Sequence, residues 1–335
     1  MDYILSNKDW IFSGIGIFII SGIISFIRKK SSIEQENSKH QSGNNNIQTD
    51  GDVTVNHTTN VYEKKELEEM KSPLIELANK FYSILENHGV SRVQIPSFID
   101  KKFNIHYADV ADEHSIIPKI SDELLEWVSL KLGIRRSWFD AKDDLMYNSV
   151  YCYKDVGEFR NLFNKLIDEF TVYDYKDYLR VYFLKTFKDF KGDKSGEEGI
   201  AEVMIIVSVQ IGETHTNAVN KYILITENLS WDYEKSRQDI KRMIRIADKL
   251  RIDTRGFDIS KDEYHEIASG KVVPRAILSK KRITWYPEDY NGSFNDRIDE
   301  IEYEHSEPFQ ESLRSIDDKI YEMLEEKRQQ FKEKI

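Results

Sequence analysis

The strongest hydrophobic feature of the chain lies near its N-terminus. Residues 10–27 read WIFSGIGIFIISGIISFI, eighteen residues without a charge. As a helix rising about 1.5 Å per residue, this segment spans about 27 Å, close to the thickness of a bilayer's hydrocarbon core. Trp10 stands at one end, where interfacial aromatic residues gather, and Arg28, Lys29 and Lys30 follow the other end. The pattern predicts a transmembrane helix from Trp10 to Ile27.

The charges around this segment favour a retained anchor and predict its orientation. The alternative, a cleavable signal peptide, would carry a basic stretch before the apolar run and small residues before a cleavage site. Here Asp2, Lys8 and Asp9 precede the run, and the basic residues follow it. The positive-inside bias then places residues 1–9 outside and the rest in the cytoplasm. We therefore expect a single-pass protein of the inner (cell) membrane, N-out and C-in.

A polar linker with a candidate hairpin is predicted over residues 28–60, which are rich in Ser, Asn, Gln and Thr. Asp50-Gly51 lies between two short alternating segments, which is the signal of a two-residue β-hairpin. A lone hairpin is marginal in water, so the linker is either an oligomerising stalk or a disordered tether. Ser21 and Ser25 have a spacing that lets two membrane helices approach closely. A homo-oligomer through the anchor and the linker is therefore one predicted partnership.

Residues 61–148 have the periodicity of several short helices. The first covers residues 61–88, with Pro73 placed to begin a new helix. Segments 93–103 and 106–114 are predicted as the next two helices, with Asn104 at the turn between them. A further amphipathic helix begins after Ser121, an expected N-cap, and ends at Gly133.

The order and spacing of these helices resemble the lambda-repressor-like helix-turn-helix group over about residues 74–144. Gln94 stands where that family often carries Gln, and Asn104-Ile105 stands at its turn. Its later helices are matched by Pro118, Leu124-Leu125, Leu132-Gly133-Ile134 and Ser137-Trp138-Phe139. The resemblance implies a helix-turn-helix fold with residues 106–114 in the recognition helix. The chain departs from the family at Asp100, where the family has a small Ala packed between two helices.

The charge of the recognition segment argues against DNA binding. Residues 106–114 read HYADVADEH, with three carboxylates and no Lys or Arg. DNA affinity depends mainly on Lys and Arg that neutralise phosphates. Residues 91–150 carry eight basic and ten acidic side chains, a net charge of −2. We therefore favour a helical adaptor or packing module and regard DNA as an unlikely partner.

The same segment contains metal-ligand types, namely His106, Asp109, Asp112 and His114. On one continuous helix His106 and Asp109 share a face, whereas Asp112 falls on another. No second His or Cys cluster supports a site. The favoured interpretation is a solvated acidic helix, and no metal or cofactor is predicted.

The second half of the chain predicts an α+β domain over residues 149–290. Stretches with the composition of strands are residues 178–187, 200–211 and 222–226. Their connections are too short for helical crossovers, which indicates an antiparallel meander. The other elements expected are helices at 158–170, 230–250 and 262–268 and an edge strand at 282–285. Helices around an antiparallel sheet suggest a ligand-binding or sensor-like domain.

Residues 291–335 hold an acidic segment, 296–307, and a terminal helix, 309–335, with near-heptad apolar spacing typical of a short coiled coil. The predicted fold class is therefore α+β. Its parts are a single transmembrane helix, a helix-turn-helix-like module, an antiparallel-sheet domain and a C-terminal helix.

Composition removes several function classes. The net charge of −11, from 48 basic and 59 acidic residues, makes wholesale coating of nucleic acid implausible. The single cysteine, Cys152, excludes an intrachain disulfide framework and a multi-thiolate metal site. The chain contains no P-loop, G-x-G-x-x-G, H-E-x-x-H or G-x-S-x-G motif. No catalytic residue is predicted.

Two sets of residues in the helix at 230–250 are candidate binding sites. A basic stripe recurs about every four residues, comprising Arg237, Lys241, Arg242, Arg245 and Lys249. Its predicted partners are anionic inner-leaflet lipid, a nucleic acid or the protein's own segment 296–307, and the alternative is a solvated face. Trp231 and Tyr233 are candidate ligand contacts, with core aromatic residues as the alternative.

These observations predict a membrane-anchored cytoplasmic regulatory or sensory protein that acts by binding a ligand or a protein partner. The first alternative is a membrane-tethered DNA-binding regulator. The second is an enzyme of unrecognised type in the α+β domain, which a pocket joining perturbed titratable groups would support.

Overall fold

The computed structural model describes residues 73–152, 154–170, 174–187, 190, 201–215, 217–292 and 306–334. The predicted anchor at 10–27 and linker at 28–60 lie outside these residues. Among the described helices, none is long and apolar enough to cross a membrane.

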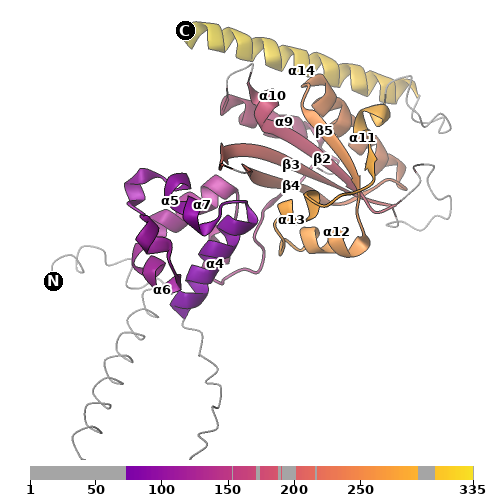
Figure 1. Cartoon of the computed structure of the whole chain (residues 1–335). Coiled ribbons are helices and arrows are strands. Elements are labelled where there is room, and N and C mark those ends of the chain that lie inside the picture. Colours follow the sequence, from indigo (N-terminus) through magenta and orange to yellow (C-terminus); the bar gives the residue numbers. More distant parts are fainter. Residues whose placement is uncertain are drawn as a thin grey trace, which may run out of the picture. The chain divides into compact units, whose positions relative to one another are not determined.

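Short helical elements make up the N-terminal part of the described chain (Figure 1). In order they are α4 (Pro73–Asn87), η1 (Arg92–Gln94), α5 (Ile95–Phe98), η2 (Lys101–Phe103), η3 (Tyr107–Val110), α6 (Glu113–Ile116), η4 (Ile117–Lys119), α7 (Asp122–Leu132) and α8 (Arg136–Phe139). Their apolar faces, which include Phe81, Leu85, Ile95, Leu124 and Val128, are fully buried. We call residues 78–148 the helical module.

The predicted continuous helices at 93–103 and 106–114 are wrong, because side-chain caps divide each into short turns. Asp100 has a non-helical backbone, with φ −55° and ψ 133°, and its carboxylate caps η2 by accepting a hydrogen bond from the backbone N–H of Lys102. Asp112 has an extended backbone and caps α6 through the N–H of Ser115. Carboxylates at such N-cap positions compete with helix continuation.

The sequence predicted the turn and the α7 caps correctly. Asn104 has left-handed backbone angles, with φ 50° and ψ 50°. The Ser121 hydroxyl accepts a hydrogen bond from the N–H of Leu124 at 3.2 Å, as an N-cap should. Gly133, with φ 73°, ends α7 in the left-handed conformation that glycine adopts without strain.

A mixed sheet forms the centre of the second part, with the order β1-β4-β3-β2-β5-β6 among the described strands. These strands are β1 (Ser149–Val150), β2 (Leu179–Lys185), β3 (Glu202–Glu213), β4 (Ala218–Ser230), β5 (Asp253–Asp258) and β6 (Thr284–Trp285). The antiparallel meander β2–β3–β4 and the edge strand β6 are confirmed.

A purely antiparallel sheet is a wrong prediction. Strand β5 pairs in parallel with β2, and β1 pairs in parallel with β4. Strand β5 can run parallel to β2 because a long connection through α11 (Glu234–Lys249) carries the chain from β4 to the other side of β2. Strand β5 was not predicted because its sequence, DTRGFD, has no apolar run.

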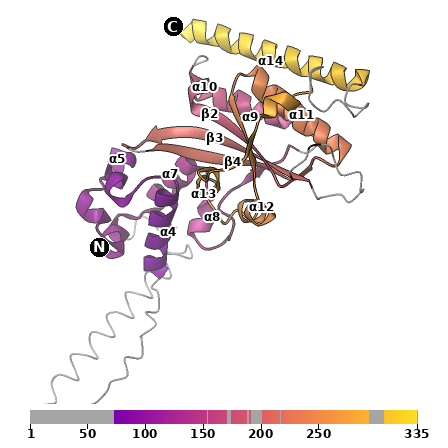
Figure 2. The same cartoon turned by 45° about the vertical axis from the view of Figure 1, so that its right-hand side comes forward.

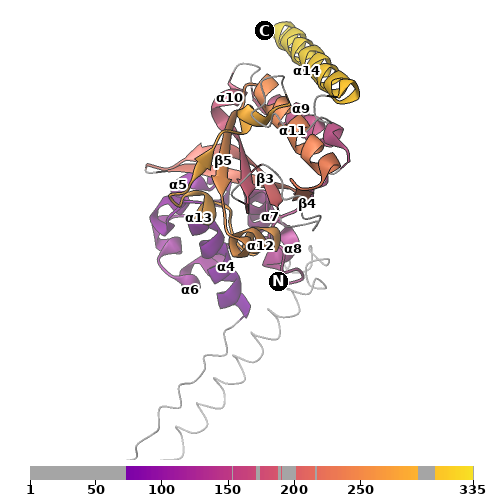
Figure 3. The ribbon, with the colours of Figure 1, turned by 90° about the vertical axis from the view of Figure 1, so that its right-hand side faces the viewer.

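Helices cover one face of the sheet in two layers (Figures 1 and 3). The inner helices are α9 (Val156–Asp168) and α11, and α14 (Glu307–Lys334) lies outside them. The core between sheet and helices includes Phe159, Phe163, Val181, Phe183, Ile205, Val207, Ile240, Ile244, Ile320 and Met323. The α14 residues that suggested a coiled coil, such as Ile320 and Met323, are thus buried within the protein's own core.

The remaining helical elements are α10 (Tyr175–Tyr178), α12 (Lys261–Ala268), α13 (Arg275–Leu278) and η5 (Pro287–Tyr290). Figure 2 shows α12 and α13 on the side of the sheet away from α9 and α11. The end of β3 reaches the helical module, since a Cβ on Gly212 would lie 3.6 Å from the Phe98 ring.

A buried histidine joins the helical module to the sheet. His88 is fully buried, with Nδ1 at 2.8 Å from the Asn220 carbonyl oxygen and Nε2 at 2.9 Å from the Tyr147 hydroxyl. The described residues from Ala78 onward form one compact unit.

Candidate functional site

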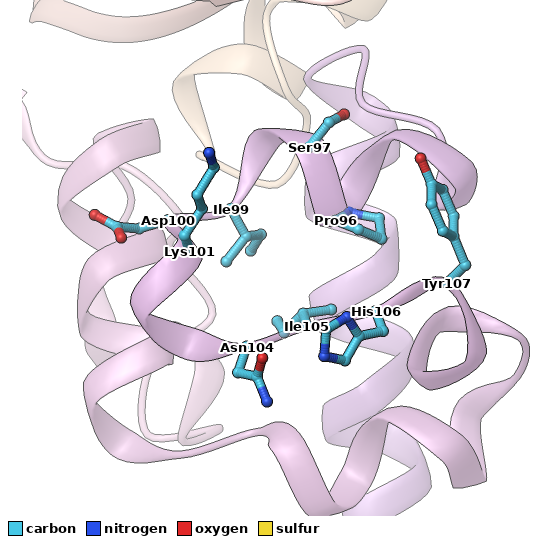
Figure 4. A pocket seen from close by; sticks show the side chains of 9 residues that line it. All are labelled: Pro96, Ser97, Ile99, Asp100, Lys101, Asn104, Ile105, His106 and Tyr107. Atoms are coloured by element: carbon cyan, nitrogen blue, oxygen red, sulfur yellow. The ribbon is translucent and has the colours of Figure 1, made fainter.

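A pocket of about 450 Å³ lies in the helical module, at the chain reversal around Asn104 (Figure 4). Its lining comes from α5, η2 and the chain that follows them, namely Pro96, Ser97, Ile99, Asp100, Lys101, Asn104, Ile105, His106 and Tyr107. Figure 4 shows Pro96 and Tyr107 on one side, Asp100 and Lys101 on the opposite side, and Asn104 at the bottom.

The local sequence explains why a hollow forms here. Pro96 sits at the start of α5, where its ring fits, Ile99 ends that helix with an extended backbone, and Asp100 then caps η2. The left-handed Asn104 then reverses the chain. Ile99 and Ile105, on either side of this reversal, are 3% and 8% exposed, so they give the pocket an apolar floor.

The rim of the pocket is accessible and polar, with an aromatic side chain beside it. Tyr107 is 70% exposed, and Val93 on neighbouring η1 is equally exposed. Lys101 and Asn104 are exposed as well. The amine of Lys101, the side-chain amide of Asn104 and the hydroxyl of Tyr107 form no hydrogen bond or ion pair with any residue that the structure describes. An apolar floor with a few unpaired polar groups is the usual composition of a ligand site.

Next to the pocket, the carboxylates of residues 106–114 stabilise local structure. The Asp109 carboxylate accepts from the N–H of His106 at 2.8 Å, and that bond lowers its pKa. Asp112 likewise has a lowered pKa because the N–H of Ser115 donates to it. Glu113 pairs with Arg92 at 2.8 Å. The segment is therefore two capped turns, and the predicted single acidic helix is corrected.

The basic stripe of α11 is not one exposed face, because its first two members point inward. Arg237 is 5% exposed and Lys241 is 1% exposed. The Arg237 guanidinium donates to the Trp231 carbonyl oxygen at 2.5 Å, and the Lys241 amine lies 6.0 Å from the centre of the Trp231 ring. Helical spacing correctly places Arg237 and Lys241 on one side of α11. That side is not exposed at these two residues, because Trp231, just before the helix, packs over them.

The last three members of the stripe hold α14. Arg245 donates to both carboxylate oxygens of Asp317, at 2.9 and 2.6 Å, and Lys249 lies 3.2 Å from the same carboxylate. Arg242 donates to the Ser312 hydroxyl at 3.1 Å and stacks over the Phe309 ring at 5.0 Å. The acid of α14 that meets the stripe is thus Asp317, and Arg242 also pairs with Asp239 of its own helix at 2.8 Å. Segment 296–307 lies almost wholly outside the described residues.

The candidate ligand contacts in front of α11 do not form a site together. Trp231 is fully buried in the core, and its indole N–H donates to the Phe190 carbonyl oxygen at 3.0 Å. Its ring packs against Phe190 and Tyr290. Tyr233, partly exposed, is the N-cap residue of α11. Trp231 is therefore a core aromatic residue, which was the alternative interpretation. Arg237, which donates to its carbonyl oxygen, is buried beside it.

Other titratable groups lie away from the pocket. Burial raises the pKa of the Cys152 thiol to about 12, so the thiol stays protonated at neutral pH. Burial lowers the pKa of His88 to about 4 and raises that of Tyr147. In the described part of the chain, no group of three or more His, Cys, Asp or Glu side chains could hold a metal ion.

The pocket was not predicted from the sequence, although Pro96, Asp100 and Asp112 are helix-start residues that could have revealed the broken helices. Comparison with known proteins adds no assignment to this geometry. No family model, no curated protein and no solved structure matches the chain.

Proposed function

We propose that this is a membrane-anchored regulatory or sensory protein whose helical module binds a small ligand in the pocket lined by residues 96–107. The observation that carries the proposal is the pocket itself. Its volume of about 450 Å³ suits a small molecule, and its rim offers the unpaired Lys101, Asn104 and Tyr107 side chains. The apolar run from Trp10 to Ile27 supports the anchor.

Binding is favoured over catalysis by the state of the reactive groups. A catalytic site usually joins an accessible nucleophile or base to a partner that tunes its pKa. Cys152 and His88 are buried, and burial keeps both uncharged at neutral pH. The pocket has polar groups that orient a ligand and, among the described residues, no such catalytic pair.

The second candidate function is a membrane-tethered DNA-binding regulator. One observation favours it: Asp109 and Glu113 are engaged by Lys119 and Arg92, which reduces their repulsion of phosphates. Two observations oppose it. Residues 91–150 still carry a net charge of −2, and residues 106–114 form two turns rather than a helix that fits the major groove.

The test measures heat stability of the full chain in detergent with a small-molecule extract of the source cells. Ser97→Trp places a large ring at the mouth of the pocket and leaves the core intact, because Ser97 is exposed. Leu130→Ser, at a site 68% exposed on α7, is the control. We expect the extract to raise the melting temperature of the wild type and of the control but not of Ser97→Trp.

Two results would contradict the proposal. One is an extract that stabilises none of the three proteins or stabilises all three equally. The other is tight, salt-dependent binding of duplex DNA that Ser97→Trp does not change, which would favour the DNA-binding alternative. The anchor is tested by cell fractionation: the full chain should pellet with membranes, and a chain without residues 10–27 should not.

A further inference from the structure

Part of the sheet face opposite α9 and α11 is open among the described residues. Side chains opposite one another in neighbouring strands point to the same face. By the strand register, Arg180 of β2 stands opposite Asp253 of β5, and Tyr182 stands opposite Arg255. The next residue after β6, Tyr286, has an extended backbone and continues the row beyond Arg255. We call these five residues the arginine face.

The arginines of this face are exposed but held in place. Arg180 donates to the Asp253 carboxylate at 2.6 Å, and Arg255 donates to the same carboxylate at 3.0–3.2 Å. The side chains of Arg180 and Arg255 are 47% and 56% exposed, so part of each guanidinium remains available to solvent. Two arginines share one carboxylate, which leaves a net positive charge and two oriented donors.

A third arginine borders the same face. Tyr222 of β4 lies on this side of the sheet, because Arg180 pairs with Ser208 and Ser208 pairs with Tyr222. Burial raises the pKa of Tyr222, and the positive charges of Arg275 on α13 and of Arg180 both lower it. Arg275 forms no ion pair with a described residue.

Aromatic rings alternate with these charges. Tyr182 packs against Phe257 with ring centres 5.9 Å apart, which holds its ring steady on the sheet. Tyr286 is 65% exposed, with a ring free to stack. The order across the strands is therefore Tyr182, Arg255 and Tyr286: a ring, a cation and a ring.

We propose that the arginine face binds single-stranded nucleic acid, with guanidiniums on phosphates and tyrosine rings on bases. Arginine forks fit phosphate oxygens, and exposed aromatic rings on a sheet stack bases without regard to sequence. An acidic peptide would use the charges but not the rings, and a fatty acyl chain would use the rings but not the charges. Neither the pocket at residues 96–107 nor a second one, lined among others by Lys131, Glu169 and Phe170, includes a residue of this face, and an open surface suits an extended strand better than a free nucleotide.

The net charge of −11 is compatible with this surface, because it describes the whole chain. Phosphate contacts at Arg180 and Arg255 act over distances shorter than the screening length of about 10 Å. This inference is independent of the pocket at residues 96–107, so each can fail without the other.

The experiment uses the full chain in uncharged detergent and fluorescently labelled oligothymidylate and oligouridylate of about twelve nucleotides. Anisotropy gives the dissociation constant at about 50 and about 200 mM salt. We expect Arg180→Gln/Arg255→Gln to weaken binding at least about tenfold and to reduce the salt slope by about 1.4, the value for two lost phosphate contacts on a single strand. Tyr286→Ser, at an exposed site, should weaken binding several-fold with little change in the salt slope.

The matched control is Arg314→Gln/Arg328→Gln, which removes two exposed, ion-paired arginines from α14. It should bind as the wild type does, and circular dichroism verifies that every variant folds. The proposal is overturned if the wild type does not bind at about 100 µM, the weak limit of non-specific binding. It is also overturned if both arginine pairs matter equally, if Tyr286→Ser and Arg180→Gln/Arg255→Gln both bind normally, or if a mononucleotide competes as well as the strand.

Discussion

The junction between the helical module and the sheet makes stability depend on pH through His88. The ring is fully buried; its Nδ1–H donates to the Asn220 carbonyl, and its Nε2 accepts from the Tyr147 hydroxyl. This arrangement needs the neutral ring, because a protonated ring would have no acceptor for the hydroxyl proton. Burial lowers the pKa of His88 from 6.5 to about 4.

The magnitude follows from the difference between the two states. Above pH 6.5 the ring is neutral in both the folded and the unfolded chain. As pH falls below 6.5, the unfolded chain binds a proton that the folded chain refuses until pH 4. At about 1.4 kcal/mol for each pH unit, folding loses about 3 kcal/mol over this window.

The assay is urea unfolding of the full chain at several pH values between 5 and 7, followed by tryptophan fluorescence. His88→Gln is the comparison, since its amide can donate and accept but does not titrate. Carboxylates such as Glu263, whose pKa Arg282 holds well below its usual range, lose their contribution below about pH 5 and so stay outside the window. We expect the wild type to lose about 1.4 kcal/mol more than His88→Gln for each pH unit below 6.5, and the same amount as His88→Gln above it. Equal pH slopes for the two proteins would refute this account of the junction.

Three further predictions concern local contacts. Asp317→Asn should lower the free energy of unfolding by about 1–2 kcal/mol and speed proteolysis within α14, because it weakens bonds to two cations on α11, whereas exposed Asp318→Asn should not. Ser121→Ala should cost about 1 kcal/mol in urea unfolding by removing the N-cap of α7; no loss would mean that the cap is not needed. Gly133→Ala, with φ 73° and a Cβ 2.8 Å from a lysine side chain, should lower the melting temperature, unlike Gly212→Ala, whose Cβ meets ordinary contacts.

The sequence was sufficient to predict features in which a residue interacts with its neighbours along the chain. Ser121, Gly133 and Asn104 have the backbone roles that their residue types predict. The meander of β2, β3 and β4 followed from apolar strands joined by short connections. These features depend on few residues close in sequence, so no tertiary information was needed.

The remaining features depend on partners distant in sequence. Strand β5 is half polar because one of its faces is exposed, so its pattern does not stand out from a loop. Arg237 and Lys241 lie at surface-like helical positions, and only the fold brings Trp231 over them. The candidate pocket forms because caps such as Asp100 interrupt the predicted helices. The spacing of apolar residues does not show whether such a residue caps a new turn or continues the helix, so the sequence did not predict the pocket.

Native mass spectrometry of the full chain, released from detergent after incubation with a small-molecule extract of the source cells, tests the central claim most directly. Our account predicts that the wild type carries a bound small molecule and that Ser97→Trp, with its ring at the mouth of the pocket, carries none. A wild-type chain that appears bare, or a Ser97→Trp chain that carries the same added mass as the wild type, would contradict the assignment of ligand binding to the pocket at residues 96–107.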